Sequence, residues 1–383
     1  MRRFRIPERL GWRDKAKAVS FGFHEMYGEP YWLDDVAYAF SLAEIEDEVE
    51  APSEALHELC MSVVADVVGD EAMLRRLGIP EAYFDLVRDS WRSGERHLYG
   101  RFDLAYTGNG PAKMLEYNAD TPTAVFESAY FQHNWLIDQI EAGALPEATD
   151  QFNYLQESLV EAFSQFPPDR IFHFACWVEN EEDRGTTTYL MDCAVQAGHQ
   201  VDMIDIRAIG VDAQGRFTDE KQRTIDRCFK LYPWEDMLRE PFAQHLKPGV
   251  FIEPAWKAIL SNKGILPLLW DRYPDHPNLL PAYFADDPRA SALPAIVSKP
   301  IFSREGENVT IMESGTITEE APGVYAAEPR IVQAYTPLFE SEGQYAVLGS
   351  WMIGDRAAGL GIREDATRIT RNLSRFVPHI IEG

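Results

Sequence analysis

The sequence has few cysteines and no long apolar run, and both shortages narrow the class of protein. The four cysteines of the 383-residue chain lie far apart, without a CxxC pair: Cys60, Cys176, Cys193 and Cys228. This spacing argues against a disulfide framework or a zinc–thiolate site and favours a reducing cytoplasm. No run of about 18 apolar residues predicts a transmembrane helix. The basic N-terminus lacks the apolar segment that follows it in a signal peptide.

Positive charge is also scarce. Lys and Arg number 36 against 62 Asp and Glu, which gives a formal net charge of −26 at pH 7. A surface this acidic repels nucleic-acid backbones and anionic membranes, so neither is expected as a partner. The same charge suits a cationic substrate, although a solvated acidic surface that keeps the protein soluble is the simpler interpretation. Hydrophobic residues make up 45% of the chain, enough for a packed core in two or three domains.

Apolar spacing divides the chain into regions of different character. Residues from about 33 to 95 have the spacing of helices, as in ALHELCMSVVADVV. Residues 166–245 then predict a βαβ unit and a parallel sheet. The unit is expected to contain a strand, an acidic loop, a helix and a second strand, at residues 171–178, 179–188, 185–197 and 201–206. After residue 250, a helix over EPAWKAIL gives way to short antiparallel strands, so the chain is of the α/β (α+β) class.

The stretch RFDLAYTGNGPAKMLEYNAD, residues 101–120, predicts two short strands around a Gly-rich turn. Residues i and i+2 of a strand share a face, so Arg101 lies beside Asp103 and Glu116 beside Asn118. Two carboxylates and an amide oxygen suit Mg²⁺, and an adjacent Arg suits a phosphate held next to the metal. The alternatives are a solvent-facing, salt-bridged hairpin and a carboxylate pair of the glycosidase kind.

Two lysines and a loop are the next candidates. Lys257 lies in EPAWKAIL, and Lys299 interrupts the apolar strand AIVSKPIF. The following turn, SREGEN, contains Gly306, which lets backbone N–H groups approach a phosphate closely. Each lysine has the alternative of a simple solvated side chain, and the turn that of an ordinary hairpin.

Two further candidates lie toward the C-terminus. Gln333, in RIVQAYTPLF, is placed to line an adenine pocket, or belongs to an ordinary core strand. The segment GSWMIGDRAAGLGIRED predicts a hairpin that turns at Gly354 and Asp355 and brings Arg363 to the end of its second strand. Arg363 is a candidate to neutralise a transferring phosphoryl group, with a plain ion pair to Glu364 or Asp365 as the alternative.

Taken in order, these segments resemble the glutathionylspermidine synthase family of ATP-grasp ligases, above all its stand-alone acid–amine ligase members. The matching segments, among them LEYNADTPT, EPAWKAILSNKGILPLLW and SKPIFSREGENV, span residues 101–365, and the helical N-terminus also fits. The resemblance implies an ATP-grasp fold with a small pre-ATP-grasp-like βαβ domain and a helical N-terminal region. The expected divisions are 1–100 (helical), 101–165 (hairpin and helix), 166–245 (small α/β domain) and 246–383 (nucleotide-binding region, interleaved in space with 101–135).

The resemblance also implies roles for single residues. Asp103, Glu116 and Asn118 correspond to the family's Mg²⁺ ligands, and Arg101 to an Arg that meets the reacting acyl phosphate. Thr121 and Thr123 fall in a substrate-facing turn where the family often has serines. The remaining correspondences concern ATP: Lys257 and Lys299 with its phosphates, Gln333 with adenine, and Arg363 with the transferring phosphate.

The implied reaction joins a small peptide-like acid to an amine through an acyl phosphate, with ATP and two Mg²⁺ ions as cofactors, and a polyamine is a candidate for the amine. The chain has no Cys-His pattern of an amidase, so ligation without hydrolysis of the product is expected. The acidic loop at residues 179–188 is a candidate for recognising the acid or the acceptor. Two alternatives stay open: a MgATP-binding ATPase or regulatory protein without ligase turnover, and a nucleotide-independent hydrolase that uses Asp103 and Glu116.

Overall fold

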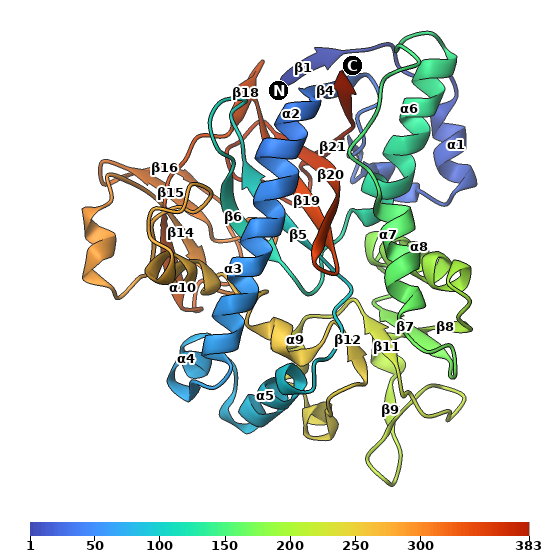
Figure 1. The fold of residues 1–383 in the computed structure, drawn as a ribbon, viewed down its shortest axis with the longest axis vertical. Coiled ribbons are helices and arrows are strands. Elements are labelled where there is room, and N and C mark those ends of the chain that lie inside the picture. Colours follow the sequence, from blue (N-terminus) through green and yellow to red (C-terminus); the bar gives the residue numbers. More distant parts are fainter. Residues whose placement is uncertain (383) are drawn as a thin grey trace.

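A six-stranded antiparallel sheet forms the centre of the computed structural model, which describes residues 1–382 (Figure 1). Its strands come from two distant parts of the chain: β5 (Tyr99–Ala105), β6 (Lys113–Asn118), β18 (Phe339–Ser341), β19 (Gln344–Ile353), β20 (Arg356–Asp365) and β21 (Arg375–Val377). β5 pairs with β19, so that Asp103 lies opposite Gly349. The predicted hairpins over 101–120 and around Gly354 are both confirmed.

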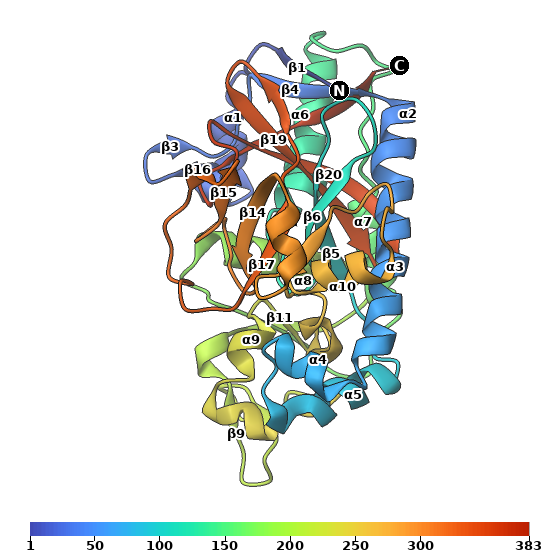
Figure 2. The ribbon, with the colours of Figure 1, turned by 90° about the vertical axis from the view of Figure 1, so that its left-hand side faces the viewer.

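A second antiparallel sheet of five strands faces the β6 edge of the first (Figure 2). Its strands are β13 (Ala282–Phe284), β14 (Ala295–Pro300), β15 (Thr310–Glu313), β16 (Thr316–Glu320) and β17 (Arg330–Ala334). Side chains join the two sheets, because Lys299 and Gln333 donate hydrogen bonds to backbone carbonyls of β6 at Leu115 and Met114. The space between the sheets is therefore bordered by polar groups from both.

The predicted βαβ unit is confirmed as part of a four-stranded parallel sheet. The order is β12-β11-β7-β8, with β7 (Phe172–Cys176), β8 (Val201–Asp205), β11 (Cys228–Lys230) and β12 (Phe251–Ile252). Helices α7 (Leu155–Ser164) and α8 (Glu181–Gln196) pack on this sheet.

The expected acidic loop at residues 179–188 is wrong, because α8 already begins at Glu181. Asn180 caps this helix by accepting hydrogen bonds from the backbone N–H groups of Glu182 and Asp183. Acidic side chains in a first turn also interact favourably with the helix dipole. The acidic residues therefore stand on a helix N-terminus rather than on a free loop.

The N-terminal region contains the expected helices and also two strands. A continuous rod runs from α2 (Leu42–Ile45) through a π-helical segment at Glu46–Glu50 into α3 (Ala51–Val67). The helical interpretation of residues 36–41 is wrong: VAYAFS forms strand β4 (Val36–Ser41), whose alternating Ala and bulkier side chains are buried on both sides. β4 pairs with β1 (Arg2–Arg5) and with β22 (His379–Glu382), which places the two ends of the described chain side by side (Figures 1 and 2).

Shorter elements complete the fold. The helix predicted over EPAWKAIL is only a single 3₁₀ turn at Ala255–Ala258. The next helix begins at Ile265. The remaining helices are α1 (Trp12–Ala18), α4 (Glu71–Arg76), α5 (Phe84–Arg92), α6 (Gln132–Glu141), α9 (Trp234–Met237) and α10 (Ile265–Arg272). The remaining strands are β2 (Glu25–Met26), β3 (Glu29–Pro30), β9 (Gly210–Val211) and β10 (Phe217–Thr218). Within residues 1–382, no helix is both long and apolar enough to cross a membrane.

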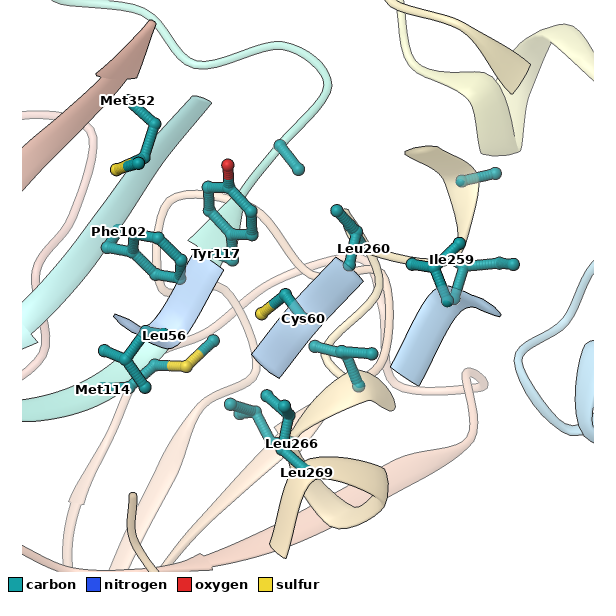
Figure 3. Close-up of a cluster of buried hydrophobic side chains, with 14 of the residues drawn as sticks. Leu56, Cys60, Phe102, Met114, Tyr117, Ile259, Leu260, Leu266, Leu269 and Met352 are labelled. Atoms are coloured by element: carbon teal, nitrogen blue, oxygen red, sulfur yellow. The ribbon is translucent and has the colours of Figure 1, made fainter. Parts of the chain in front are cut away.

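The β5–β6 hairpin rests on α3 through an apolar core (Figure 3). Phe102 of β5 stacks on Tyr117 of β6 with ring centroids 3.9 Å apart, and Met114 lies beside them. Leu56 and Cys60 of α3 close the cluster from the other side. Burying a large apolar side chain contributes about 1.5–3 kcal/mol, so this packing fixes the hairpin and leaves its opposite face free for polar groups.

Candidate active site

The four polar side chains predicted from the hairpin meet on one face of β5 and β6. Arg101 donates to both oxygens of Asp103, from Nε at 2.7 Å and from Nη2 at 3.2 Å. The amide nitrogen of Asn118 lies 3.2 Å from Asp103 Oδ2 and 3.1 Å from Glu116 Oε1. A β-bulge follows Asp103 in the pairing of the two strands, and it turns Leu115 toward the same side. The prediction that these four side chains lie together on one face of the hairpin is confirmed.

The two carboxylates differ in their electrostatic surroundings. Burial raises the pKa of Asp103, although Arg101 opposes this shift. Burial would also raise the pKa of Glu116, but the nearby Lys263 and Lys299 outweigh it and lower the pKa to about 2. Lys263 Nζ lies 3.0 Å from Glu116 Oε2. Glu116 is therefore anionic across the physiological range, and a further cation beside Asp103 would favour its charged form as well.

A cavity between the two antiparallel sheets begins at these carboxylates; we call it the inter-sheet cavity. Its polar lining includes Lys299, which donates to the Gln333 side chain at 2.8 Å and to the Leu115 carbonyl at 2.9 Å. The rest is largely apolar, with side chains from both sheets: Val297, Val309, Ile311, Tyr335, Leu338, Val347 and Ile369. A partly apolar space that is also lined by Lys263, Lys299 and Arg368 has the chemistry that a nucleotide needs, since the base requires burial and the phosphates require cations.

Lys257 does not reach this cavity. Its side chain is fully buried, and its Nζ lies 2.7 Å from Glu253 and 2.6 Å from the carbonyl oxygen of Tyr99. Glu253 also accepts hydrogen bonds from the backbone of Leu98 and Tyr99. Lys257 thus forms a buried ion pair that holds the start of β5. This position corrects the expectation that Lys257 faces the phosphates. The lysine that lines the cavity from this segment is Lys263, six residues later.

A second cavity, of about 310 Å³, shares Asp103 and Glu116 with the first and extends to the N-terminus of α8; we call it the acidic cavity. Arg304 crosses it, donating from Nη1 to Thr121 Oγ1 at 2.8 Å and from Nη2 to Glu235. Arg101 donates to the Thr123 carbonyl at 2.9 Å. Thr121 and Thr123 thus both line the acidic cavity, one bonded to Arg304 and the other to Arg101.

The loop after β14 covers the junction of the two cavities. Gly306 lines both of them with a φ of 72°, where a Cβ would collide with the carbonyl oxygen of Thr370 and lie 2.8 Å from Ile369 Cγ2. Only glycine fits this backbone path, because left-handed φ and the close contact both exclude a side chain.

Arg363 reaches the acidic cavity from β20. Its guanidinium is held by the carbonyls of Ser374 at 2.8 Å and Asn372 at 2.9 Å, and it lies over the ring of Tyr31. It shares a small pocket with Arg101. No ion pair with Glu364 or Asp365 is seen within residues 1–382, so the guanidinium charge stays available to an anion.

The far side of the acidic cavity is lined by three carboxyl groups, those of Glu182, Asp183 and Glu305. Burial, followed by the neighbouring Glu182 and Glu305 charges, raises the pKa of Asp183 to about 7. Burial likewise raises the pKa of Glu305, with Glu182 adding to the shift. Three crowded carboxyl groups repel one another until a cation binds among them, so this side of the cavity is suited to a positively charged ligand.

The hairpin fits a divalent cation by its donor set. Asp103 and Glu116 present carboxylate oxygens within one small space, and turning over the Asn118 amide, whose nitrogen now donates to both, would add its oxygen to the set. The cleft opens toward the lysines and arginines that would hold phosphates. Mg²⁺ binds through one or two carboxylates and shares the remaining positions with substrate phosphates and water. The residues present therefore fit Mg²⁺.

Sequence reasoning missed Lys263 and Arg304 as components of this site, whereas the acidic residues at the start of α8 lie within the stretch 179–188 that it singled out, although as a helix rather than a loop. Lys263 had a visible signal, since SNKG interrupts an apolar stretch just before a helix. Arg304 lies in the very loop that was singled out for Gly306. The burial of Asp183 carried no signal beyond the local acidity of the sequence, because the charges of Glu305 and Arg304 come near it only in the folded chain.

Two facing antiparallel sheets with a polar cleft between them define an ATP-grasp protein. A solved structure of a glutathione synthetase-like effector (GSS30) from Globodera pallida matches 90% of this chain and 89% of its own, with a TM-score of 0.56 and 10% sequence identity. At this identity the likeness supports the fold alone. The expected ATP-grasp fold, with its α/β parts, is thus confirmed.

The sequence comparisons are more specific. The family model described as "Glutathionylspermidine synthase preATP-grasp" matches residues 3–382, and the chain belongs to the glutathionylspermidine synthase family. A Haemophilus influenzae protein named "Putative acid–amine ligase" is 40% identical over 98% of both chains. Trypanothione synthetase of Crithidia fasciculata is 30% identical over 82% of this chain, which spans 52% of that protein. The bifunctional glutathionylspermidine synthetase/amidase of Escherichia coli is 23% identical, and the chain spans 63% of its length. The protein is accordingly an ATP-dependent ligase of the C–N bond-forming class.

Proposed function

We propose that this protein joins a small carboxylic acid to a cationic amine, with ATP converting the acid to an acyl phosphate. The observation that carries the proposal is the continuity of the two cavities. The inter-sheet cavity and the acidic cavity share Asp103, Glu116 and Gly306, so a nucleotide in one would present its terminal phosphate to a substrate in the other.

The nucleotide half of the site is supported by Lys263, Lys299 and Gln333. The two lysines lie near Glu116 and would hold the phosphates, while Gln333 fixes Lys299 and borders the apolar space for adenine. Mg²⁺, held by Asp103, Glu116 and Asn118, would neutralise phosphate charge and orient the terminal phosphoryl group.

The chemical step is supported by the two arginines at the junction. A substrate carboxylate oxygen attacks the γ-phosphorus, the bond to the β-phosphate oxygen breaks, and ADP and an acyl phosphate result. Arg101 and Arg363 lie beside this point and would stabilise the charge on the transferring group. The amine nitrogen then attacks the acyl carbon, inorganic phosphate leaves, the nitrogen loses a proton, and an amide remains.

The substrates are narrowed by charge. Thr121, Thr123 and the arginines suit the acid, whereas Glu182, Asp183 and Glu305 suit a cationic amine such as a polyamine. The names of the relatives point to glutathione-like acids and spermidine-like amines, and we extend that substrate class to this chain. Four buried, unpaired cysteines are in keeping with a reducing cytoplasm.

The rival functions have less support. A nucleotide-binding protein without turnover has little use for two arginines aimed at one point. A hydrolase that works through Asp103 and Glu116 would need a carboxyl group free to transfer protons. In this structure Arg101 and Lys263 hold both groups in ion pairs.

The decisive experiment incubates the protein with MgATP and a matrix of acids and amines and measures ADP release. We expect release that depends on both an acid and an amine, with the amide as product. With the acid and hydroxylamine in place of the amine, an acyl hydroxamate should accumulate. ADP release that no acid stimulates, across a panel that includes glutathione and shorter peptides, would overturn the proposal.

A further inference from the structure

Two histidines and an aspartate from distant segments meet behind the hairpin, away from both cavities. His57 lies on α3, His97 just before β5, and Asp355 in the turn between β19 and β20. The Nε2 atoms of both imidazoles lie 3.0 Å from the same oxygen, Asp355 Oδ1. One potential ligand atom from each of the three residues lies within 4.8 Å of the other two. We call this group the His-His-Asp cluster.

The spacing of the cluster matches that of ligands around a metal ion. In a tetrahedral zinc site, nitrogen and oxygen ligands lie about 2.0–2.2 Å from the ion, so neighbouring ligand atoms are about 3.3–3.5 Å apart. The two separations of 3.0 Å between Nε2 and Asp355 Oδ1 need to widen by only a few tenths of an ångström to admit an ion, and the ligand atoms of the two histidines lie within 4.8 Å of each other. Asp355 is mostly exposed and lies in a turn, so this small movement is available to it.

We propose that the His-His-Asp cluster is a binding site for a divalent first-row transition metal, with Zn²⁺ as the ion that fits best. Two imidazoles and one carboxylate are typical ligands of such metals, whereas Mg²⁺ prefers oxygen alone. Three protein ligands leave one tetrahedral position, which faces solvent on the side of Asp355 and would hold water.

The surroundings of His57 support the assignment. Its other ring nitrogen, Nδ1, lies 3.0 Å from the hydroxyl of Tyr117. A metal-bound imidazole donates its remaining N–H to an outer partner that fixes the ring, and the Tyr117 oxygen is in position to accept it. Room for the Tyr117 ring comes from Gly100, where a Cβ would lie 2.8 Å from Cε2 and 2.9 Å from the hydroxyl.

Both rings are also held in place before any ion binds. The side chains of His57 and His97 are 2% and 11% exposed, and the rings stack with centroids 5.5 Å apart. The ring of His97 also packs edge-on against Trp256. Nε2 of His97 faces Asp355 and is the atom through which the ring can bind an ion, whereas Nδ1 is buried without a hydrogen-bond partner.

The cluster is separate from the proposed ligase site, although the same strand serves both. Glu116 and Asn118 point to the cleft, whereas Tyr117, between them, points to the cluster. A bound ion would tie α3, the start of β5 and the β19–β20 turn together. Because these segments meet only in the folded chain, Zn²⁺ would stabilise the folded state by mass action.

The test uses the full chain, stripped of metal and titrated with Zn²⁺ against a chromophoric chelator. We expect one tight site per chain in the parent protein. The Asp355→Asn variant keeps an acceptor for the imidazoles but is a poor zinc ligand, so its zinc affinity should fall at least about tenfold. His97→Gln should have a similar effect, and the exposed His133→Gln should have none.

A further variant separates this site from the cleft. Glu116→Ala removes a carboxylate from the hairpin and should leave tight Zn²⁺ binding intact. Co²⁺ bound in place of Zn²⁺ should show the intense visible absorption of a tetrahedral site rather than the weak bands of an octahedral oxygen site. Tight zinc that survives both Asp355→Asn and His97→Gln, or that disappears in Glu116→Ala, would overturn the proposal. So would a parent protein with no tight zinc at all.

Discussion

The two sides of the β5–β6 hairpin have opposite chemistry, and a β-bulge after Asp103 brings Met114 to the same side as Phe102 and Tyr117. The side that faces α3 carries Phe102, Met114 and Tyr117, which are buried and packed against an apolar core (Figure 3). The side that faces the cleft carries Arg101 and Glu116, with their polar neighbours, and opens to both cavities.

This difference shows how stability and function are divided within a single pair of strands. On the core side, packing determines the position of the backbone. On the cleft side, each charge is held by another charge, as in the bidentate pair of Arg101 and Asp103. Substitutions on the cleft side should therefore reduce activity with little loss of stability, and substitutions that disturb the support behind it should do the reverse.

The largest effect on activity is expected for Glu116→Ala. Glu116 would hold the metal and lies close to Lys263 and Lys299, so its loss removes charge stabilisation from the step that transfers the phosphoryl group. We expect acid- and amine-dependent ADP release to fall at least about a thousandfold, or about 4 kcal/mol in the barrier. Steady-state assay of ADP at saturating Mg²⁺ measures this change.

The control for this variant is Glu58→Ala, which removes an exposed carboxylate from α3. It should keep parental turnover, and both variants should unfold near the parental midpoint. Parental ADP release by Glu116→Ala would contradict the assignment of the hairpin as the metal site.

Lys257→Met tests the core side of the hairpin, where we expect substitutions to reduce stability rather than activity. Lys257 and Glu253 form a fully buried ion pair that holds the start of β5, and removing one partner leaves an uncompensated buried charge. Such a change costs about 3–5 kcal/mol of folding free energy. Chemical denaturation should show this loss, while the nucleotide affinity of the folded fraction stays close to the parental value.

The exposed Lys247→Met is the matched control and should leave both quantities unchanged. If Lys257→Met instead weakened nucleotide binding at unchanged stability, Lys257 would be a phosphate ligand as the sequence first suggested.

The sequence alone predicted the hairpin and its polar face because alternation with a period of two is a local signal. Arg101, Asp103, Glu116 and Asn118 could be assigned to one face from their spacing alone. The βαβ unit was predictable for the same reason, since strand and helix periods alternate along the chain. The ATP-grasp fold itself came from resemblance, because the pairing of β5 with β19 joins segments too distant for any local pattern.

The choice between Lys257 and Lys263 was not predictable from the sequence. The two lysines are six residues apart, and the chain between them follows a 3₁₀ turn and an irregular connection rather than a regular element. Periodicity therefore does not predict the direction in which either lysine side chain points. Only the ion pair between Lys263 and Glu116 shows which lysine lies in the cleft. The strand at Val36–Ser41 was missed for a related reason, since a run buried on both sides shows no strand period.

The smallest predicted effect concerns Lys299, and it depends on pH. Burial lowers the pKa of Lys299 to about 8, although the charge of Glu116 opposes the shift. ATP phosphates bind the protonated lysine, so the titration of Lys299 should not change nucleotide affinity below about pH 8. As the pH rises through that value the free protein loses the proton, and affinity should fall. Lys299→Ala should bind about 10- to 100-fold more weakly than the parent near neutral pH, the range expected for one charge-assisted hydrogen bond.

The gap between parent and Lys299→Ala should therefore narrow as the pH rises from about 7 to about 9.5, because the parent gradually loses the charge that the variant lacks. Calorimetric titration with a non-hydrolysable ATP analogue and Mg²⁺ measures it, and the exposed Lys17→Ala should follow the parent throughout. A constant gap across this range would mean that Lys299 contributes through its shape or its hydrogen bond to Gln333 rather than through its charge. The cleft side of the hairpin would then owe its attraction for phosphate to Lys263 and the arginines alone.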